Sequence, residues 1–253
     1  MNANLILFGL AILPVFVLAF VVYRQDKYER EPIGKLLKAF FFGVISVLPV
    51  ILLEEWLTLY TPPMPVISGA YTAFAVAGCS EEGFKLLFLL LAIWKSPEFD
   101  EYFDGIVYSC FVALGFAGCE NISYVFSQTE YSTALTTGVM RAVLSVPAHF
   151  LFGVMMGYYV ALAKFNRDRR FMYLVLAFLV PMLLHGVFDS LLMIPETMVS
   201  GGEIAEVVLF VILIVFDIKM WKWGVRRIRR LQLLTQQQDF DRNHPFDGFT
   251  WNF

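Results

Sequence analysis

The sequence predicts an all-α polytopic membrane protein, a bundle of about seven transmembrane helices with the N-terminus outside and the C-terminus cytoplasmic. Three observations predict this fold class. Hydrophobic residues make up 58% of the 253 residues and charged residues only 16%, and the mean hydropathy is +0.67, so a soluble globular domain is excluded. Apolar runs recur along the chain, each long enough to span a bilayer. Finally, Lys and Arg gather in alternate loops.

The apolar runs divide the chain into successive spans. A bilayer-spanning helix needs about 20 apolar residues, and the runs that meet this length are 5–23, 36–53, 65–94, 105–126, 134–163, 171–194 and 204–223. The first run has no basic segment before it and no small-residue cleavage site, so we expect a span rather than a signal peptide. We expect one transmembrane domain, residues 1–223, followed by a cytoplasmic basic and aromatic tail, residues 224–253.

The distribution of positive charge predicts the orientation. Of the 19 Lys and Arg residues, 17 lie in or beside the first, third and fifth loops or near the C-terminus; the other two, Lys85 and Arg141, lie within spans and away from these loops. Cytoplasmic loops of membrane proteins are enriched in these residues. We therefore predict a multi-pass protein of the cell membrane, whose basic C-terminal cluster contacts anionic lipid. We expect no nucleic acid partner.

The third span carries three charged residues, Glu81, Glu82 and Lys85. A charge near the bilayer centre costs roughly 2.5–3.5 kcal/mol on insertion scales, so such residues usually face a bundle interior or a wet cavity. On a helix Lys85 follows Glu81 by four positions and Glu82 by three, so both carboxylates can contact the ammonium. A structural ion cluster is one interpretation, but a second carboxylate favours a functional site.

Other polar residues occur at matching depth in later spans. With a helical rise of about 1.5 Å per residue, one layer about 20–24 Å from the cytoplasmic ends contains Glu82, Glu120, His149 and His185. His185 and Asp189 are four residues apart and share a helix face. Asn121 adjoins Glu120 as a further candidate, whereas we expect Arg141 to snorkel or pair rather than catalyse. The predicted layer lies near or somewhat outside the midplane, so a cavity there should open toward the outer face.

This set of residues suggests hydrolysis. A buried carboxylate can act as a general base that activates water for attack on a peptide carbonyl, and an imidazole or Lys85 could stabilise the oxyanion. The same set could hold a divalent metal such as zinc, with Glu82, His149 and His185 as candidate ligands. These residues alone do not separate the two mechanisms. The sequence contains neither H-E-x-x-H nor G-x-S-x-G, the motifs of other hydrolases.

Several motifs in order resemble the PrsW family of intramembrane proteases, distant relatives of the CAAX-processing and bacteriocin-immunity proteases. The motifs are Glu81-Glu82-Gly83-Phe84-Lys85, Asp104-Gly105-Ile106-Val107-Tyr108, Gly115-Phe116-Ala117-Gly118-Cys119-Glu120-Asn121, His149 and His185-Gly186-Val187-Phe188-Asp189. The first loop, with Asp26 and Glu31-Pro32, is also similar.

The resemblance implies an intramembrane endopeptidase acting on a membrane-anchored protein, with first-step cleavage of an anti-sigma factor as its namesake role. It further implies that Glu81 or Glu82 activates water with His149, while His185 and Asp189 help to bind the oxyanion. The family name often carries the word metalloprotease, whereas relatives are described as glutamate-type enzymes; we expect the metal-independent mechanism.

Two other functions remain open at this point. Buried Glu, His and Lys residues in one layer would also suit an ion-coupled transporter, although the paired interrupted helices of such proteins are missing from the sequence. A non-catalytic scaffold of the same fold is the other alternative. The substrate, the cleavage position and the oligomeric state do not follow from the sequence.

Overall fold

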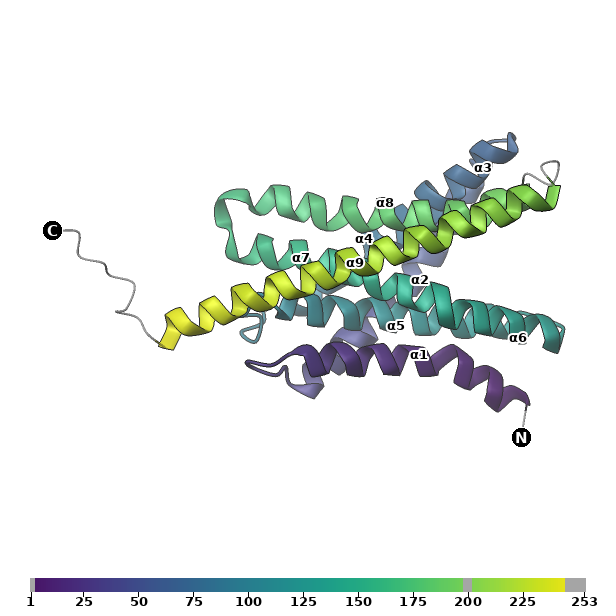
Figure 1. Ribbon diagram of the computed structural model, residues 1–253. Coiled ribbons are helices and arrows are strands. Elements are labelled where there is room, and N and C mark those ends of the chain that lie inside the picture. Colours follow the sequence, from purple (N-terminus) through teal and green to yellow (C-terminus); the bar gives the residue numbers. More distant parts are fainter. Residues whose placement is uncertain (1–2, 198–201, 244–253) are drawn as a thin grey trace.

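The computed structural model describes residues 3–197 and 202–243, which form helices and connecting loops (Figure 1). The α-helices are α1 (Ala3–Gln25), α2 (Ile33–Thr58), α3 (Pro65–Tyr71), α4 (Cys79–Ile93), α5 (Asp104–Phe126), α6 (Tyr131–Met140), α7 (Val146–Phe165), α8 (Arg170–Thr197) and α9 (Gly202–Asn243). Two π-helical segments, Thr72–Gly78 and Arg141–Ser145, lead into α4 and α7, and a short 3-10 helix, Arg167–Arg169, leads into α8. The predicted all-α architecture is confirmed.

Five helical segments of the described chain are long and apolar enough to cross a membrane: Ala3–Gln25, Ile33–Thr58, Asp104–Phe126, Tyr131–Phe165 and Arg167–Met193. They coincide with the first, second, fourth, fifth and sixth predicted spans. The third and seventh predicted spans are helical too, but their membrane crossing stays a prediction, as does the orientation. The predicted boundary at residue 223 falls inside α9, which continues to Asn243; residues 244–253 of the predicted tail lie outside the described residues.

The loops that contain Lys and Arg lie at one end of the bundle. Residues 26–32, 94–103 and 166–169 lie on the left in Figure 1, together with the C-terminal end of α9. We call this the basic end. The opposite end holds the C-terminus of α2, α3, the C-terminus of α5 and α6. The alternation of Lys- and Arg-containing loops in the sequence therefore corresponds to their separation along the bundle.

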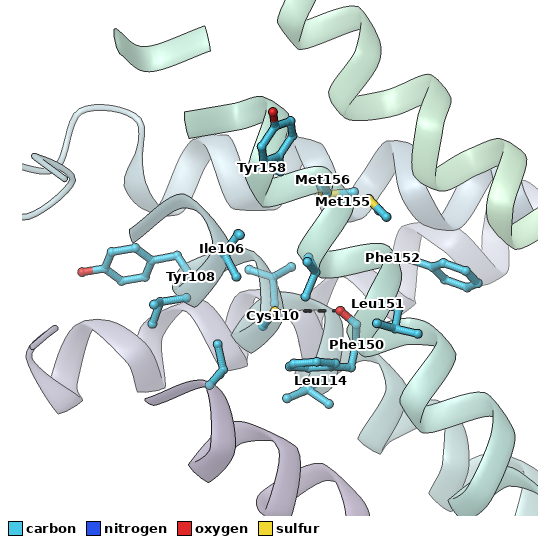
Figure 2. Packing of buried hydrophobic residues seen from close by; sticks show 14 of the residues in the cluster. Ile106, Tyr108, Cys110, Leu114, Phe150, Leu151, Phe152, Met155, Met156 and Tyr158 are labelled. Atoms are coloured by element: carbon cyan, nitrogen blue, oxygen red, sulfur yellow. Dashed lines mark hydrogen bonds between the residues drawn. The ribbon is translucent and has the colours of Figure 1, made fainter. Parts of the chain in front are cut away.

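The central helix is α5, which packs against α1, α2, α4, α6 and α7. In its most apolar stretch 78% of the residues are buried, against 22% in α1. Figure 2 shows how residues such as Cys110 and Leu114 of α5 pack against Phe150 and Leu151 of α7, where the Cys110 Sγ donates to the Phe150 carbonyl at 3.8 Å. Exposed apolar side chains cover the outer faces of the peripheral helices α1 and α2, as expected for surfaces that contact lipid.

Glycines let the helices cross α5 at very short range. Where α2 crosses α5, a Cβ on Gly115 would overlap the backbone carbonyl of Phe40, and where α7 crosses α5, a Cβ on Gly157 would overlap the carbonyl of Gly105. Small residues at such crossings allow backbones to approach closely, the main source of packing energy between helices in lipid. These crossings set the positions of the helices that carry the polar layer.

We expect Gly115→Ala to lower the free energy of unfolding by about 1–3 kcal/mol, the usual cost of overpacking. The obstructing Phe40 carbonyl is backbone and cannot rotate away as a side chain would. The matched control is Gly9→Ala in α1, where no atom lies within 4 Å of the added Cβ and the higher helix propensity of alanine acts alone. Thermal unfolding in detergent compares the two variants; equal midpoints would contradict the close crossing.

Candidate active site

A cavity of about 350 Å³ lies between α2, α4, α5, α7 and α8. Its lining includes Glu54, four residues from the end of α2, and Tyr124, two residues from the end of α5. The cavity is therefore displaced toward the end of the bundle opposite the basic end. The depth estimate placed the polar layer away from the basic end, as seen here; which end faces outward stays a prediction.

Five of the eight candidate residues line this cavity; two others lie behind its wall, and Asn121 has its partners elsewhere. The lining includes Glu81, Glu120, His149, His185 and Asp189. Glu82 and Lys85 are 0% exposed and are not part of the lining. The two adjacent glutamates, equivalent in the sequence, therefore have different environments, because only Glu81 can meet a molecule in the cavity.

Lys85 is the centre of a buried polar network. Its Nζ donates to Glu81 Oε2 at 2.9 Å and to Glu82 Oε1 at 2.8 Å, and it lies 3.1 Å from His149 Nδ1. The same ammonium lies 4.0 Å from the centre of the Phe116 ring, within the range of a cation–π interaction. Three acceptor atoms and one aromatic face thus surround a cation that has no contact with solvent.

The contacts of His149 determine which of its nitrogens carries the proton. Nδ1 faces the Lys85 ammonium, a group that can only donate, so Nδ1 accepts and Nε2 bears the hydrogen. Nε2 then donates to Glu120 Oε2 at 2.9 Å. Glu120 also forms an ion pair with Arg141, whose Nη2 lies 2.8 Å from the same Oε2. His149 is therefore held between a cation and a carboxylate in one defined tautomer and orientation.

His185 lies between two carboxylates. Its Nδ1 is 3.0 Å from Glu82 Oε1, and its Nε2 is 3.4 Å from Asp189 Oδ2 on the same helix. With an acceptor on each side, both nitrogens can donate, an arrangement that suits a protonated ring. The His185 ring lies edge-on to the His149 ring, with 5.2 Å between the ring centres.

Asn121 is the one candidate that points away from the cavity. Its Nδ2 donates to the Ala11 carbonyl of α1 at 3.2 Å, and its Oδ1 accepts from Arg141 Nε at 2.6 Å. It therefore joins α1 to α5 and supports Arg141. Arg141 pairs, as the sequence predicted, but it also lines the cavity beside Glu54 and Tyr124. In the sequence, Arg141 could be noticed because it is a charge inside a span. Glu54 and Tyr124 lie close to helix ends, where polar residues are common, so no sequence pattern pointed to them.

Each of the two π-helical segments ends a few residues before a candidate residue. Thr72–Gly78 ends three residues before Glu81, and Arg141–Ser145 ends four residues before His149. Pro147 explains the second, because it has no N–H to donate into the preceding turn. A π segment shifts the register of everything that follows on the helix, and such segments are frequent at functional sites. A prediction that assumes regular 3.6-residue spacing along the whole helix does not include this shift.

The donor set fits the metal that the resemblance implies. Glu81, Glu82, His149 and His185 each offer one ligand atom, and these atoms all lie within 4.8 Å of one another. Two carboxylates and two imidazoles are donors that zinc accepts, and the buried Oε2 of Glu82 has no hydrogen-bond partner among the described residues. Lys85 contacts three of the four residues, so ammonium and metal compete for the same donors.

We expect Lys85→Met to destabilise the protein by about 3–5 kcal/mol, because losing one partner of a buried ion pair leaves an uncompensated charge. The second substitution Glu81→Gln removes one of the two carboxylates and should recover part of the loss. Lys95→Met, at an exposed position just after α4, is the control. Unfolding midpoints in detergent form a double-mutant cycle, and strictly additive effects would contradict the network.

Comparison with known proteins identifies the family. The sequence model described as PrsW family intramembrane metalloprotease matches residues 31–216. Curated relatives, each named Protease PrsW, include those of Clostridioides difficile strain 630 (41% identity, covering 88% of this chain and 90% of the relative), Geobacillus kaustophilus strain HTA426 (40%, 74% and 77%) and Bacillus subtilis strain 168 (31%, 91% and 94%). No solved structure gives a significant match.

The family match covers all the candidate residues, from Glu81 to Asp189, and the relatives align over most of their own length. With several membrane-spanning helices around a buried site of glutamates and histidines, the chain belongs to the PrsW family of intramembrane metalloproteases.

Proposed function

We propose that this protease cleaves a membrane-anchored protein substrate in the cavity between α2, α4, α5, α7 and α8, with Glu81 as the general base. The observation that carries the assignment is that Glu81 lines the cavity whereas its neighbour Glu82 is sealed behind it. A base has to reach the attacking water directly or through one water. Glu82, bonded to Lys85 and His185, positions both of them.

In the proposed reaction Glu81 takes a proton from water as the water oxygen attacks the scissile carbonyl carbon. The same proton passes to the departing amine when the C–N bond breaks, which leaves a new carboxyl and a new amino terminus. Because Lys85 Nζ is 2.9 Å from Glu81 Oε2, it holds the Glu81 carboxylate in place while the proton moves.

The oxyanion formed in this step needs a hydrogen-bond donor aimed into the cavity. We assign this role to His185, a lining residue whose Nε2 makes only a long contact, 3.4 Å, with Asp189. His149 lines the same cavity and is held by Lys85 and Glu120. Through Lys85 it helps to orient Glu81. A zinc ion held by Glu82, His149 and His185 would supply polarisation of the attacking water or of the scissile carbonyl.

The position of the cavity supports a cleavage site near the outer face. The cavity lies toward the end opposite the basic end, and basic loops are cytoplasmic in most membrane proteins. A substrate cut there would lose its extracytoplasmic part, the event expected of first-step cleavage of a membrane-anchored anti-sigma factor. Membership of a protease family favours hydrolysis over the transporter and the scaffold.

The test compares new protein N-termini in membranes from cells that carry wild-type protein, Glu81→Gln or Glu55→Gln at equal abundance. General-base catalysis contributes about 10²–10⁴-fold, so we expect Glu81→Gln to reduce cleavage at least about 100-fold. Glu55→Gln, an exposed residue at the end of α2 outside the cavity lining, should cleave normally. Mass spectrometry of the termini also identifies the substrate.

The variant Glu82→Gln separates the roles of the two glutamates. Because Glu82 is buried with Lys85, we expect this change to lower the unfolding midpoint as well as cleavage, whereas Glu81→Gln should affect cleavage more than stability. Normal cleavage by a folded Glu81→Gln variant would overturn the assignment of the base. Identical termini in all strains would overturn the proposed substrate class.

A further inference from the structure

A second group of carboxylates lies at the basic end, far from the active site. Asp26 follows α1, Glu101 lies in the loop before α5, and Asp104 is the first residue of α5. Their exposed fractions are 1%, 2% and 1%. One oxygen of each lies within 4.8 Å of the others. Three acidic side chains from separate segments therefore share one buried volume.

Part of this group has unsatisfied hydrogen-bonding capacity. Asp104 Oδ2 accepts from the N–H groups of Asp100 and Glu101, at 3.1 and 2.6 Å, and Asp26 Oδ2 accepts from the Glu31 N–H at 3.1 Å. By contrast, Asp104 Oδ1 and Glu101 Oε2 are buried and have no partner among the described residues. A buried polar atom without a partner costs about 1–3 kcal/mol, more when charged, so these oxygens point to a missing ligand.

The charge of the group is not balanced by neighbouring side chains. Within the described chain, no Lys, Arg or His nitrogen forms an ion pair with these three carboxylates; the nearby Arg242 pairs with Asp100 at 3.3 Å and with Glu29 at 3.8 Å instead. Glu31 adds a fourth acidic group, one oxygen of which accepts from the Tyr108 hydroxyl. Burial raises the pKa of Asp26 to about 6 and the pKa values of Glu31 and Glu101 to about 7.

We propose that Asp26, Glu101 and Asp104 bind a hard divalent cation, Mg²⁺ or Ca²⁺, at a structural site separate from the active site. A ligand set made only of oxygen donors, without imidazole or thiolate, suits these cations better than it suits zinc. Calcium, 2.3–2.6 Å from each ligand, can bridge oxygens separated by distances of this size. The unpartnered oxygens of Glu101 and Asp104 would bind this cation.

Such a cation would hold three segments together directly and a fourth, α9, through one of them. Asp26 belongs to the α1–α2 loop, Glu101 to the α4–α5 loop and Asp104 to α5, while the α4–α5 loop also binds α9. The Phe103 N–H donates to Thr235 Oγ1 at 3.0 Å, and Gln238 Nε2 donates to the Asp100 carbonyl at 2.6 Å. The site therefore controls how the loops and α9 close the basic end, and it does not depend on the proposed catalytic roles.

The test uses the full chain in a neutral detergent, stripped of metals with a chelator and returned to chelator-free buffer. Added Mg²⁺ or Ca²⁺, at constant ionic strength, should raise the midpoint of thermal unfolding by several degrees and then saturate. Glu101→Gln and Asp104→Asn should abolish this increase. Asp168→Asn, an exposed acidic residue at the same end of the bundle, should retain it.

A direct measurement guards against variants that simply fold poorly. Tb³⁺ occupies calcium sites, and its luminescence is sensitised by nearby aromatic rings, here Tyr108 beside Glu31. We expect saturable Tb³⁺ luminescence that Ca²⁺ displaces in the wild-type chain and in Asp168→Asn, but not in folded Glu101→Gln. Absence of luminescence in the wild type, with a midpoint that rises only as pH falls from 7 toward 5, would mean that shared protons neutralise the cluster and would overturn the proposal. Neither readout involves proteolysis.

Discussion

The Lys85 ammonium is surrounded by Glu81, Glu82, His149 and the Phe116 ring at a depth where no solvent reaches it. Two unit charges 4 Å apart interact by about 4 kcal/mol at an effective dielectric constant of 20, against about 1 kcal/mol in bulk water. The charges on α4 pair with one another, and α5, α7 and α8 supply the remaining partners, Phe116, His149 and His185. The packing of α4, α7 and α8 therefore has to keep this polar network intact.

Helix α5 connects the two polar centres of the molecule. Asp104 begins it at the basic end and Glu120 lies near its other end, sixteen residues further on, a separation of about 24 Å along a helix. The glycines of α5 that allow α2 and α7 to approach lie between these two residues. A single rigid element thus sets the distance between the acidic group and the active site, while the apolar packing shown in Figure 2 holds it in position.

The active site differs from the acidic group in how its charges are balanced. Around Lys85, cationic and anionic groups alternate, with Arg141 and Glu120 extending the series to the cavity wall. At the basic end, buried carboxylates gather without an ion-pair partner among the described residues. The first arrangement suits the proposed hydrolysis, and the second leaves oxygens available for the proposed cation.

The sequence by itself determined the membrane class, five of the seven predicted spans and most of the candidate residues that line the cavity. The reason is physical: charged and imidazole groups stand out in apolar runs, and i, i+4 pairs such as Glu81 with Lys85 and His185 with Asp189 follow from helix geometry alone. Tertiary structure decided everything that depends on packing between distant segments. It separated Glu81 from Glu82, turned Asn121 toward α1, placed Arg141 and Glu54 at the cavity, and brought Asp26 to Asp104. No local pattern encodes these contacts, because π-helical segments alter the register and the partners lie tens of residues apart.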